Sequence, residues 1–161
     1  MNRLVFNYPA KFITAVDCST VDVVIERGFG DATFTRMKML NQELIPKTAE
    51  NKKELFQKAT DILNLMIMGK RGIIAPSRPN AYGRSMVRIY LPCKGQHPDF
   101  PGITALYAGT QFACVNNLMV LAAQHNFNIE FIEKILTVLE IQSYEKFHRT
   151  ISEEAPAAKS G

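Results

Sequence analysis

The stretch KFITAVDCSTVDVVIERGFGDATFTRMKML (residues 11–40) decides the fold, because three segments with strand character follow one another in it. Segments 11–16 and 21–25 are rich in β-branched and aromatic residues, which suit a pleated, half-buried surface. The sequence Gly28-Phe29-Gly30-Asp31 indicates a tight turn, because glycine accepts the positive φ that hairpins need. Segment 33–40 alternates between two faces, as a strand does. We therefore predict a three-stranded meander, with Phe34, Arg36 and Lys38 on one face of its last strand.

The chain beyond the meander alternates between helical and strand patterns. Thr48 and Gly69 are expected to begin and end a helix. Its apolar face repeats at helical spacing through Leu55, Ala59, Ile62, Leu63 and Met66. Two short strands are predicted at 73–75 and 86–91, and two C-terminal helices at 114–124 and 129–140. The second of these helices is expected to be capped by Asn128. Its expected buried stripe consists of Ile129, Ile132, Ile135, Leu136 and Leu139. Five strands with a helix between the third and fourth have the order of an OB-fold, so we predict an α+β fold built on a five-stranded β-barrel.

Composition favours one reduced, water-soluble domain. A chain of 161 residues with 47% hydrophobic content suits a single core, predicted over 1–151, and the small, polar tail 152–161 is expected to be disordered. The formal charge of +4 permits a polyanionic partner without requiring one. Three widely spaced cysteines indicate reduced thiols and a cytoplasmic protein. No apolar run is long enough for a transmembrane helix, so no membrane association is expected.

Several motifs resemble one known family in order and spacing. The segment Asp17-Cys18-Ser19-Thr20-Val21 lies between the first two predicted strands, Arg36 lies in the third, and Tyr82-Gly83-Arg84 follows the first helix. With the Gly-Phe-Gly turn, this arrangement resembles the staphylococcal nuclease (thermonuclease) family over roughly residues 9–91. Val115-Asn116-Asn117-Leu118 resembles the start of the family's next helix. Residues 96–113 have no counterpart in the compact family domain, and read as loop material or an extra helix.

The resemblance implies a site for phosphodiester chemistry. Family members hydrolyse DNA or RNA with calcium, and Arg36 and Arg84 match their two phosphate-binding arginines. A guanidinium binds phosphate bidentately and stabilises charge in the transition state. Taken without the resemblance, the pattern favours an ordinary surface arginine on a strand for Arg36 and an ordinary turn arginine for Arg84. Glu43, one residue before the family's glutamate position, is the remaining candidate for a catalytic carboxylate.

The implied metal site is depleted of charge. Ser19, Asn41 and Leu44 occupy the family's two aspartate positions and its glutamate position. Asp17 remains nearby, so Asp17 and Asn41 are the candidate metal ligands. Because calcium affinity depends on the number of charged oxygen ligands, we expect no cofactor, or Ca²⁺ bound weakly.

A second feature near these motifs is a set of cations and tyrosines that flanks the predicted clamp. Arg78, Arg88 and Tyr82 are the candidate nucleic-acid contacts, with Tyr90 as a further stacking platform. An ordinary solvated surface explains the same residues equally well.

These observations predict a nuclease-like protein that binds nucleic acid but has lost catalysis. One alternative is a divalent-metal-dependent endonuclease with a rearranged site built from Asp17, Asn41 and Glu43. Another is a protein-interaction or inhibitor module that binds a partner through 96–113 and the C-terminal helices. A phage origin, and with it the host cytoplasm, fits a compact degenerate nuclease fold. The choice between DNA and RNA stays open.

Overall fold

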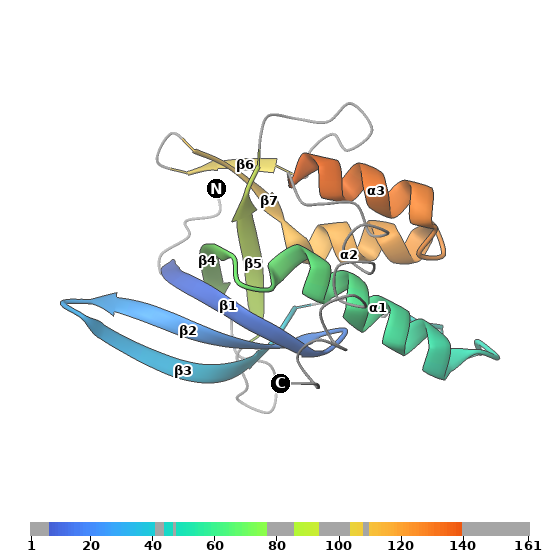
Figure 1. The fold of residues 1–161 in the computed structure, drawn as a ribbon, viewed down its shortest axis with the longest axis horizontal. Helices are drawn as coiled ribbons and strands as arrows, with labels where there is room; N and C mark the ends of the chain where they lie inside the picture. The colour runs from blue at the N-terminus through green and yellow to red at the C-terminus, as the bar shows by residue number, and fades with distance from the viewer. Residues whose placement is uncertain are drawn as a thin grey trace, which may run out of the picture.

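The computed structural model describes residues 7–40, 44–46, 48–76, 86–93, 104–107 and 110–139. These residues form an α+β structure of seven strands and three helices (Figure 1). The strands are β1 (Tyr8–Asp17), β2 (Thr20–Gly28), β3 (Asp31–Lys38), β4 (Arg71–Pro76), β5 (Val87–Pro92), β6 (Thr104–Tyr107) and β7 (Thr110–Cys114). The helices are α1 (Lys52–Ile67), α2 (Val115–Gln124) and α3 (Ile129–Val138). None of the described helices has the length and apolar character that a membrane crossing needs.

The strands form one sheet in the order β3-β2-β1-β4-β5-β7-β6, and every neighbouring pair is antiparallel. The predicted α+β class is confirmed, and the sheet is open, with two strands more than the five predicted. Beyond the end of β3, the described residues join it to β5 by a single parallel bridge, Met39 to Val87. One bridge is too little pairing to close the sheet as a ladder.

The two additional strands correct the prediction for 96–113. β6 and most of β7 lie in this segment, which we expected to be loop or helix. Strands of four and five residues are too short to show a clear period in the sequence. They form because β7 pairs with the exposed edge of β5, for example Cys114 with Tyr90, and β6 pairs with β7.

The predicted meander is confirmed as β1, β2 and β3; the first two strands are longer than expected, and the third begins and ends two residues earlier. Its turn uses three consecutive positive φ values, 91° at Gly28, 53° at Phe29 and 76° at Gly30. The predicted alternation of β3 also holds, because Phe34, Arg36 and Lys38 are exposed. The β2–β3 hairpin extends well away from the helices (Figure 1).

Helix α1 forms for the predicted reason, since Ala59, Ile62, Leu63 and Met66 are buried along one face. It begins later than expected, with Asn51 rather than Thr48 at the N-cap position, and no side chain caps it. Gly69 has the expected positive φ, at 71°, and follows the C-cap residue.

The half-buried Asn64 of α1 is hydrogen-bonded to the irregular end of β1. The register of β1 against β2 shifts between Phe12 and Thr14 and again after Ala15. At this point Asn64 Oδ1 accepts hydrogen bonds from the Ala15 backbone N–H (2.7 Å) and from Thr14 Oγ1 (3.0 Å). The side chain of Asn64 thereby satisfies backbone polarity that the irregular ladder leaves open.

The two C-terminal helices are confirmed. Asn128 caps α3 as predicted, and its Oδ1 accepts from the backbone N–H groups of Glu130 (2.9 Å) and Phe131 (3.4 Å). Ile129 does not join the buried stripe as predicted, because 41% of it is exposed in the first turn, while Ile132, Ile135, Leu136 and Leu139 are buried. The three helices lie next to one another beside the sheet (Figure 1), and their apolar faces complete one core.

Candidate functional site

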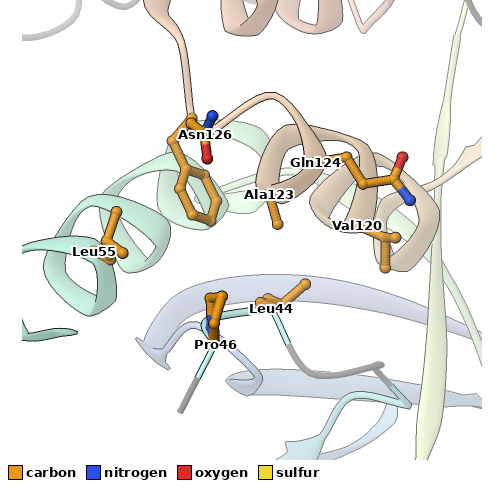
Figure 2. A pocket seen from close by; sticks show the side chains of 8 residues that line it. Leu44, Pro46, Leu55, Val120, Ala123, Gln124 and Asn126 are labelled. Atoms are coloured by element: carbon orange, nitrogen blue, oxygen red, sulfur yellow. The ribbon is translucent and has the colours of Figure 1, made fainter. Parts of the chain in front are cut away.

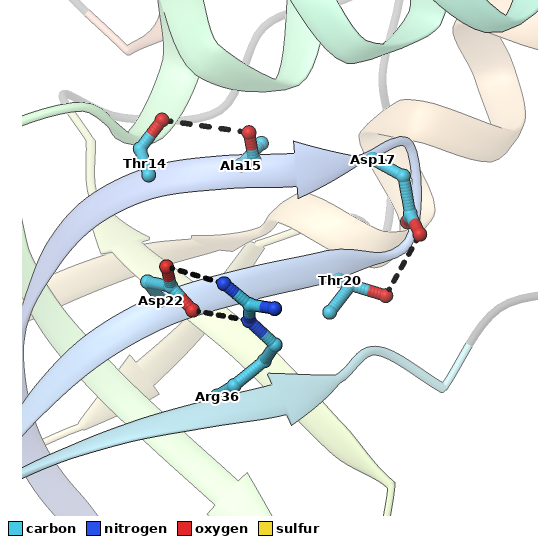
Figure 3. A network of polar contacts seen from close by, with 6 residues as sticks. All are labelled: Thr14, Ala15, Asp17, Thr20, Asp22 and Arg36. Atoms are coloured by element: carbon cyan, nitrogen blue, oxygen red, sulfur yellow. Dashed lines mark hydrogen bonds and ion pairs between the residues drawn. The ribbon is translucent and has the colours of Figure 1, made fainter.

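Arg36 lies on the outer face of β3 and is held by an aspartate on β2. Asp22 and Arg36 are direct cross-strand partners. Arg36 Nε donates to Asp22 Oδ1 at 2.8 Å, and a terminal nitrogen donates to Oδ2 at 3.2 Å (Figure 3). The Arg36 side chain is 61% exposed and that of Asp22 only 11%. One edge of the guanidinium is therefore fixed on the sheet, and the rest faces solvent.

The pair is electrostatically matched. The hydrogen bond from Arg36 lowers the pKa of Asp22 below its ordinary value, against the opposing effect of burial. The same hydrogen bond raises the pKa of Arg36, and the carboxylate of Asp17 adds a smaller effect in the same direction. Arg36 therefore keeps its charge and a fixed orientation, which are the properties that phosphate recognition needs.

Asp17 belongs to the turn between β1 and β2. Its Oδ1 accepts hydrogen bonds from the Ser19 backbone N–H (2.8 Å) and Ser19 Oγ (3.3 Å). Its Oδ2 accepts a hydrogen bond from Thr20 Oγ1 at 3.2 Å (Figure 3). Both carboxylate oxygens therefore have protein partners. This geometry is that of an aspartate that stabilises a turn through its own following residues.

The structure places only part of the predicted metal site. Asn41 and Glu43 lie outside the described residues, so Asp17 is the one member of the rearranged site that the structure places. Ser19 uses its hydroxyl toward Asp17, and Leu44 is buried. Within the described ranges, no group of three or more His, Cys, Asp or Glu side chains gathers in a way that suits a metal ion. Ca²⁺ takes six to eight oxygen ligands, so the described residues do not by themselves make a calcium site.

The predicted basic groove is placed only in part. Arg78, Tyr82 and Arg84 lie outside the described residues. Arg88 is exposed on β5, where it pairs with Ala75 and interacts with Tyr90. Tyr90 is half-buried beside Cys114, and burial, followed by the charge of Cys114, raises its pKa. The described contacts thus place Arg88 with Tyr90 and Cys114 rather than with Arg36.

The thiol beside the turn has no sign of activation. Cys18 is buried, with 6% of its surface exposed. Burial is the largest cause of its raised pKa, and the charge of Asp17 acts in the same direction. The uncharged thiol is therefore favoured, which is the opposite of what a reactive cysteine needs.

Sequence reasoning missed one pocket. It has a volume of about 330 Å³ and lies between the segment before α1, α1 itself, and α2 with the connection that follows it (Figure 2). Its lining is mostly apolar, with Leu44, Pro46, Leu55, Val120, Ala123 and Phe127, and includes the amides Gln124 and Asn126. Among the residues that the structure describes, those that line the pocket carry no ionisable side chain. No sequence pattern signals it, because its walls come from three distant segments.

Sequence reasoning also missed the partner of Arg36, although the sequence contains a signal for it. Glu26 and Ala32 pair close to the turn of the β2–β3 hairpin. Counting four residues outward along each strand reaches Asp22 and Arg36, so the turn itself predicts their pairing.

No protein-family model, no curated protein and no solved structure matches the chain.

Proposed function

We propose that the chain is a nuclease-like protein that binds DNA or RNA through phosphate contacts and does not hydrolyse it. The observation that carries this proposal is the Arg36 guanidinium, which is 61% exposed and fixed by two hydrogen bonds to Asp22. A pre-oriented guanidinium loses little conformational entropy when it binds a phosphate. Asp17, the nearest candidate metal ligand, is occupied by the turn, which supports binding without metal-assisted hydrolysis.

The second arginine of the proposed clamp is Arg84. It lies outside the described residues, so what supports it is its sequence spacing relative to a bridge between β3 and β5. Met39 and Val87 form a parallel bridge, and Leu40 N–H donates to Val87 O at 2.8 Å. Arg36 precedes Met39 by three residues and Arg84 precedes Val87 by three residues.

The same bridge supports an OB-fold-like barrel of the nuclease type as the finer description of the fold. The strand order β3-β2-β1-β4-β5, with β3 bridged to β5, brings the two ends of this series together. The cysteines Cys18, Cys93 and Cys114 form no disulfide, which supports a reducing compartment such as the cytoplasm.

The proposal is tested by fluorescence anisotropy with a labelled oligonucleotide over a range of salt concentrations in EDTA. We expect the logarithm of the dissociation constant to rise linearly with the logarithm of salt concentration, because phosphate contacts release counterions. Arg36→Gln should weaken binding and lower that slope by about one. The double variant Arg36→Gln/Asp22→Asn removes the pair without leaving a buried carboxylate unpaired, and should behave alike.

Arg27→Gln is the matched control. Arg27 lies in the same hairpin, and its guanidinium donates a hydrogen bond to Thr33. Thr33 and Arg36 are an odd number of residues apart on β3, so their side chains project from opposite faces of the strand. Loss of the Arg27 guanidinium should leave the slope within error of the wild type. Equal effects of Arg27→Gln and Arg36→Gln would show non-specific charge attraction and no clamp. Absence of any binding at low salt would refute the proposed function.

A further inference from the structure

The outer face of the sheet presents a row of side chains that crosses four strands. Lys11 on β1 is paired with Arg71 on β4 and with Val24 on β2, and Val24 is paired with Phe34 on β3. Directly paired residues project from the same face of a sheet. At about 4.8 Å between strands, the row Arg71-Lys11-Val24-Phe34 is about 14 Å long. We call it the outer row.

Phe34 is the exceptional member of the outer row. It is 63% exposed on a regular strand, and its cross-strand neighbour Val24 is half-buried. Phe34 therefore presents a ring to solvent above an apolar floor. An exposed aromatic ring can stack on a base of any nucleic-acid sequence, because every nucleobase has a π-face.

The basic side chains on the outer face of the sheet outnumber its carboxylates. Arg36 and Lys38 follow Phe34 on the same face of β3, and Lys11 and Arg71 complete the row. Of the three carboxylates on this face, Asp22 forms an ion pair with Arg36 and Glu26 with Arg71, each at a shortest N–O distance of 2.8–2.9 Å. The third, Asp17, lies in register with Thr20 and Lys38 and accepts hydrogen bonds from its own turn, so the four cations exceed the carboxylates by one. Among the described residues Lys11 and Lys38 have no ion pair, so the face keeps a positive excess.

We infer that the outer row is the track for a single strand of nucleic acid, with a base stacked on Phe34 and the backbone phosphates at Lys11 and Arg36. The assignment rests on the proposed function and specifies its ligand: a duplex keeps its base faces covered, so the ring contributes only when a base is free. The apolar floor and the positive excess occur together here, which is the combination that single-strand binding surfaces use.

The test compares a short single-stranded oligothymidine with a duplex of equal length, both fluorescently labelled, in EDTA and low salt. Phe34→Ala should raise the dissociation constant for the single strand about tenfold, since stacking contributes about 1–3 kcal/mol per base. Duplex binding should stay within about twofold. Phe34→Leu keeps an apolar side chain without a π-face and should show most of the same loss.

Matched controls come from helix α1. Phe56 is 48% exposed there, and Phe56→Ala should leave both dissociation constants unchanged. Lys11→Ala should lower the salt slope by about one, whereas Lys53→Ala, an exposed lysine of α1, should not. Because Phe34 is exposed, its variants should fold, which circular dichroism and thermal melting check.

The outcomes separate the two proposals. Wild-type binding of the single strand that is unaffected by Phe34→Ala would overturn the outer row and leave phosphate binding by Arg36 intact. An equal loss for single strand and duplex would also overturn it, because stacking on a free base would not be the cause. Failure of the wild type to bind either nucleic acid would refute both.

Discussion

The Nδ2 of Asn116 donates a 2.7 Å hydrogen bond to the backbone carbonyl of Leu40, which lies 76 residues earlier in the chain. The same nitrogen donates to Val87 O at 3.1 Å, and Oδ1 accepts from Ile89 N at 2.9 Å. Asn116 is in the first turn of α2 and only 3% exposed. The side-chain amide of Asn116 therefore supplies hydrogen bonds to the backbone at the place where the end of β3 and β5 share a single bridge.

The first prediction concerns this amide. Asn116→Ala removes the partner of the Leu40 carbonyl and of the Ile89 N–H, while Val87 O keeps its hydrogen bond from Leu40 N. Each unsatisfied group costs about 1–3 kcal/mol. We expect the free energy of unfolding to fall by about 3 kcal/mol in chemical denaturation. Asn117→Ala, at the exposed neighbouring position, is the control and should cost less than about 0.5 kcal/mol. Equal costs for the two variants would contradict the bridging role.

The second prediction concerns Gly72 on β4. A Cβ at this position would lie 2.3 Å from Tyr90 O, 2.9 Å from a Leu91 methyl carbon and 3.0 Å from the Phe12 ring. The carbonyl oxygen cannot move without disturbing the pairing of β4 with β5. Gly72→Ala should therefore destabilise the protein by about 3 kcal/mol in urea unfolding.

Gly69→Ala is the matched control for that prediction. It also has a demanding backbone, with φ at 71°, but a Cβ there meets no atom within 4 Å. Its cost should be limited to the backbone strain, about 1 kcal/mol. If Gly69→Ala proved the more costly of the two, close packing of Gly72 against β5 would not be the dominant effect.

The third prediction uses the pKa of Asp22. Because Arg36 lowers this pKa in the folded state, the unfolded chain takes up the proton first as the pH falls. The stabilisation is therefore complete above the ordinary aspartate pKa of about 3.9, and is lost as the pH falls through the lower folded-state value. We expect the wild type to lose more stability on acidification below about pH 5 than Asp22→Asn does.

Thermal melts from neutral to acidic pH measure this difference. Asp31→Asn, at an exposed aspartate of the same hairpin, is the control and should retain the wild-type acid dependence. Parallel curves for the wild type and Asp22→Asn would mean that Asp22 titrates alike in the folded and unfolded chains.

The fourth prediction separates the turn role of Asp17 from a metal role. Asp17→Ala removes the acceptor for Ser19 and Thr20, and should lower the free energy of unfolding by about 1 kcal/mol. The decrease in the free energy of unfolding should be the same in Ca²⁺ and in EDTA, because both carboxylate oxygens of Asp17 accept hydrogen bonds within the turn. A wild-type melting temperature that rises with Ca²⁺, and fails to rise in Asp17→Ala, would instead assign Asp17 to a metal.

The elements with a long, clear period could be predicted from the sequence. The meander and the three helices are of this kind, because burial repeats along each of them. β6 and β7 could not be, since their few residues gain stability from pairing with β5 rather than from any local pattern. Closure of a barrel was also beyond the pattern, because it depends on how far β3 and β5 pair.

The site was predictable in its residue types and not in its partners. Arg36 stood out by resemblance, but its link to Asp22 required the hairpin register. The difference between Asn116 and Asn117 is invisible in the sequence, because burial alone makes the first a cross-link and leaves the second in solvent. Exposure of Phe34 likewise depends on which face of β3 the core covers.

The central claim is that the protein holds nucleic acid and leaves it intact. The most direct measurement incubates a labelled single-stranded oligonucleotide with the protein in Ca²⁺, and divides each sample between a native and a denaturing gel. We predict a shifted band on the native gel and full-length oligonucleotide on the denaturing gel. Shorter products that appear in Ca²⁺, disappear in EDTA and are absent with Arg36→Gln would contradict the account.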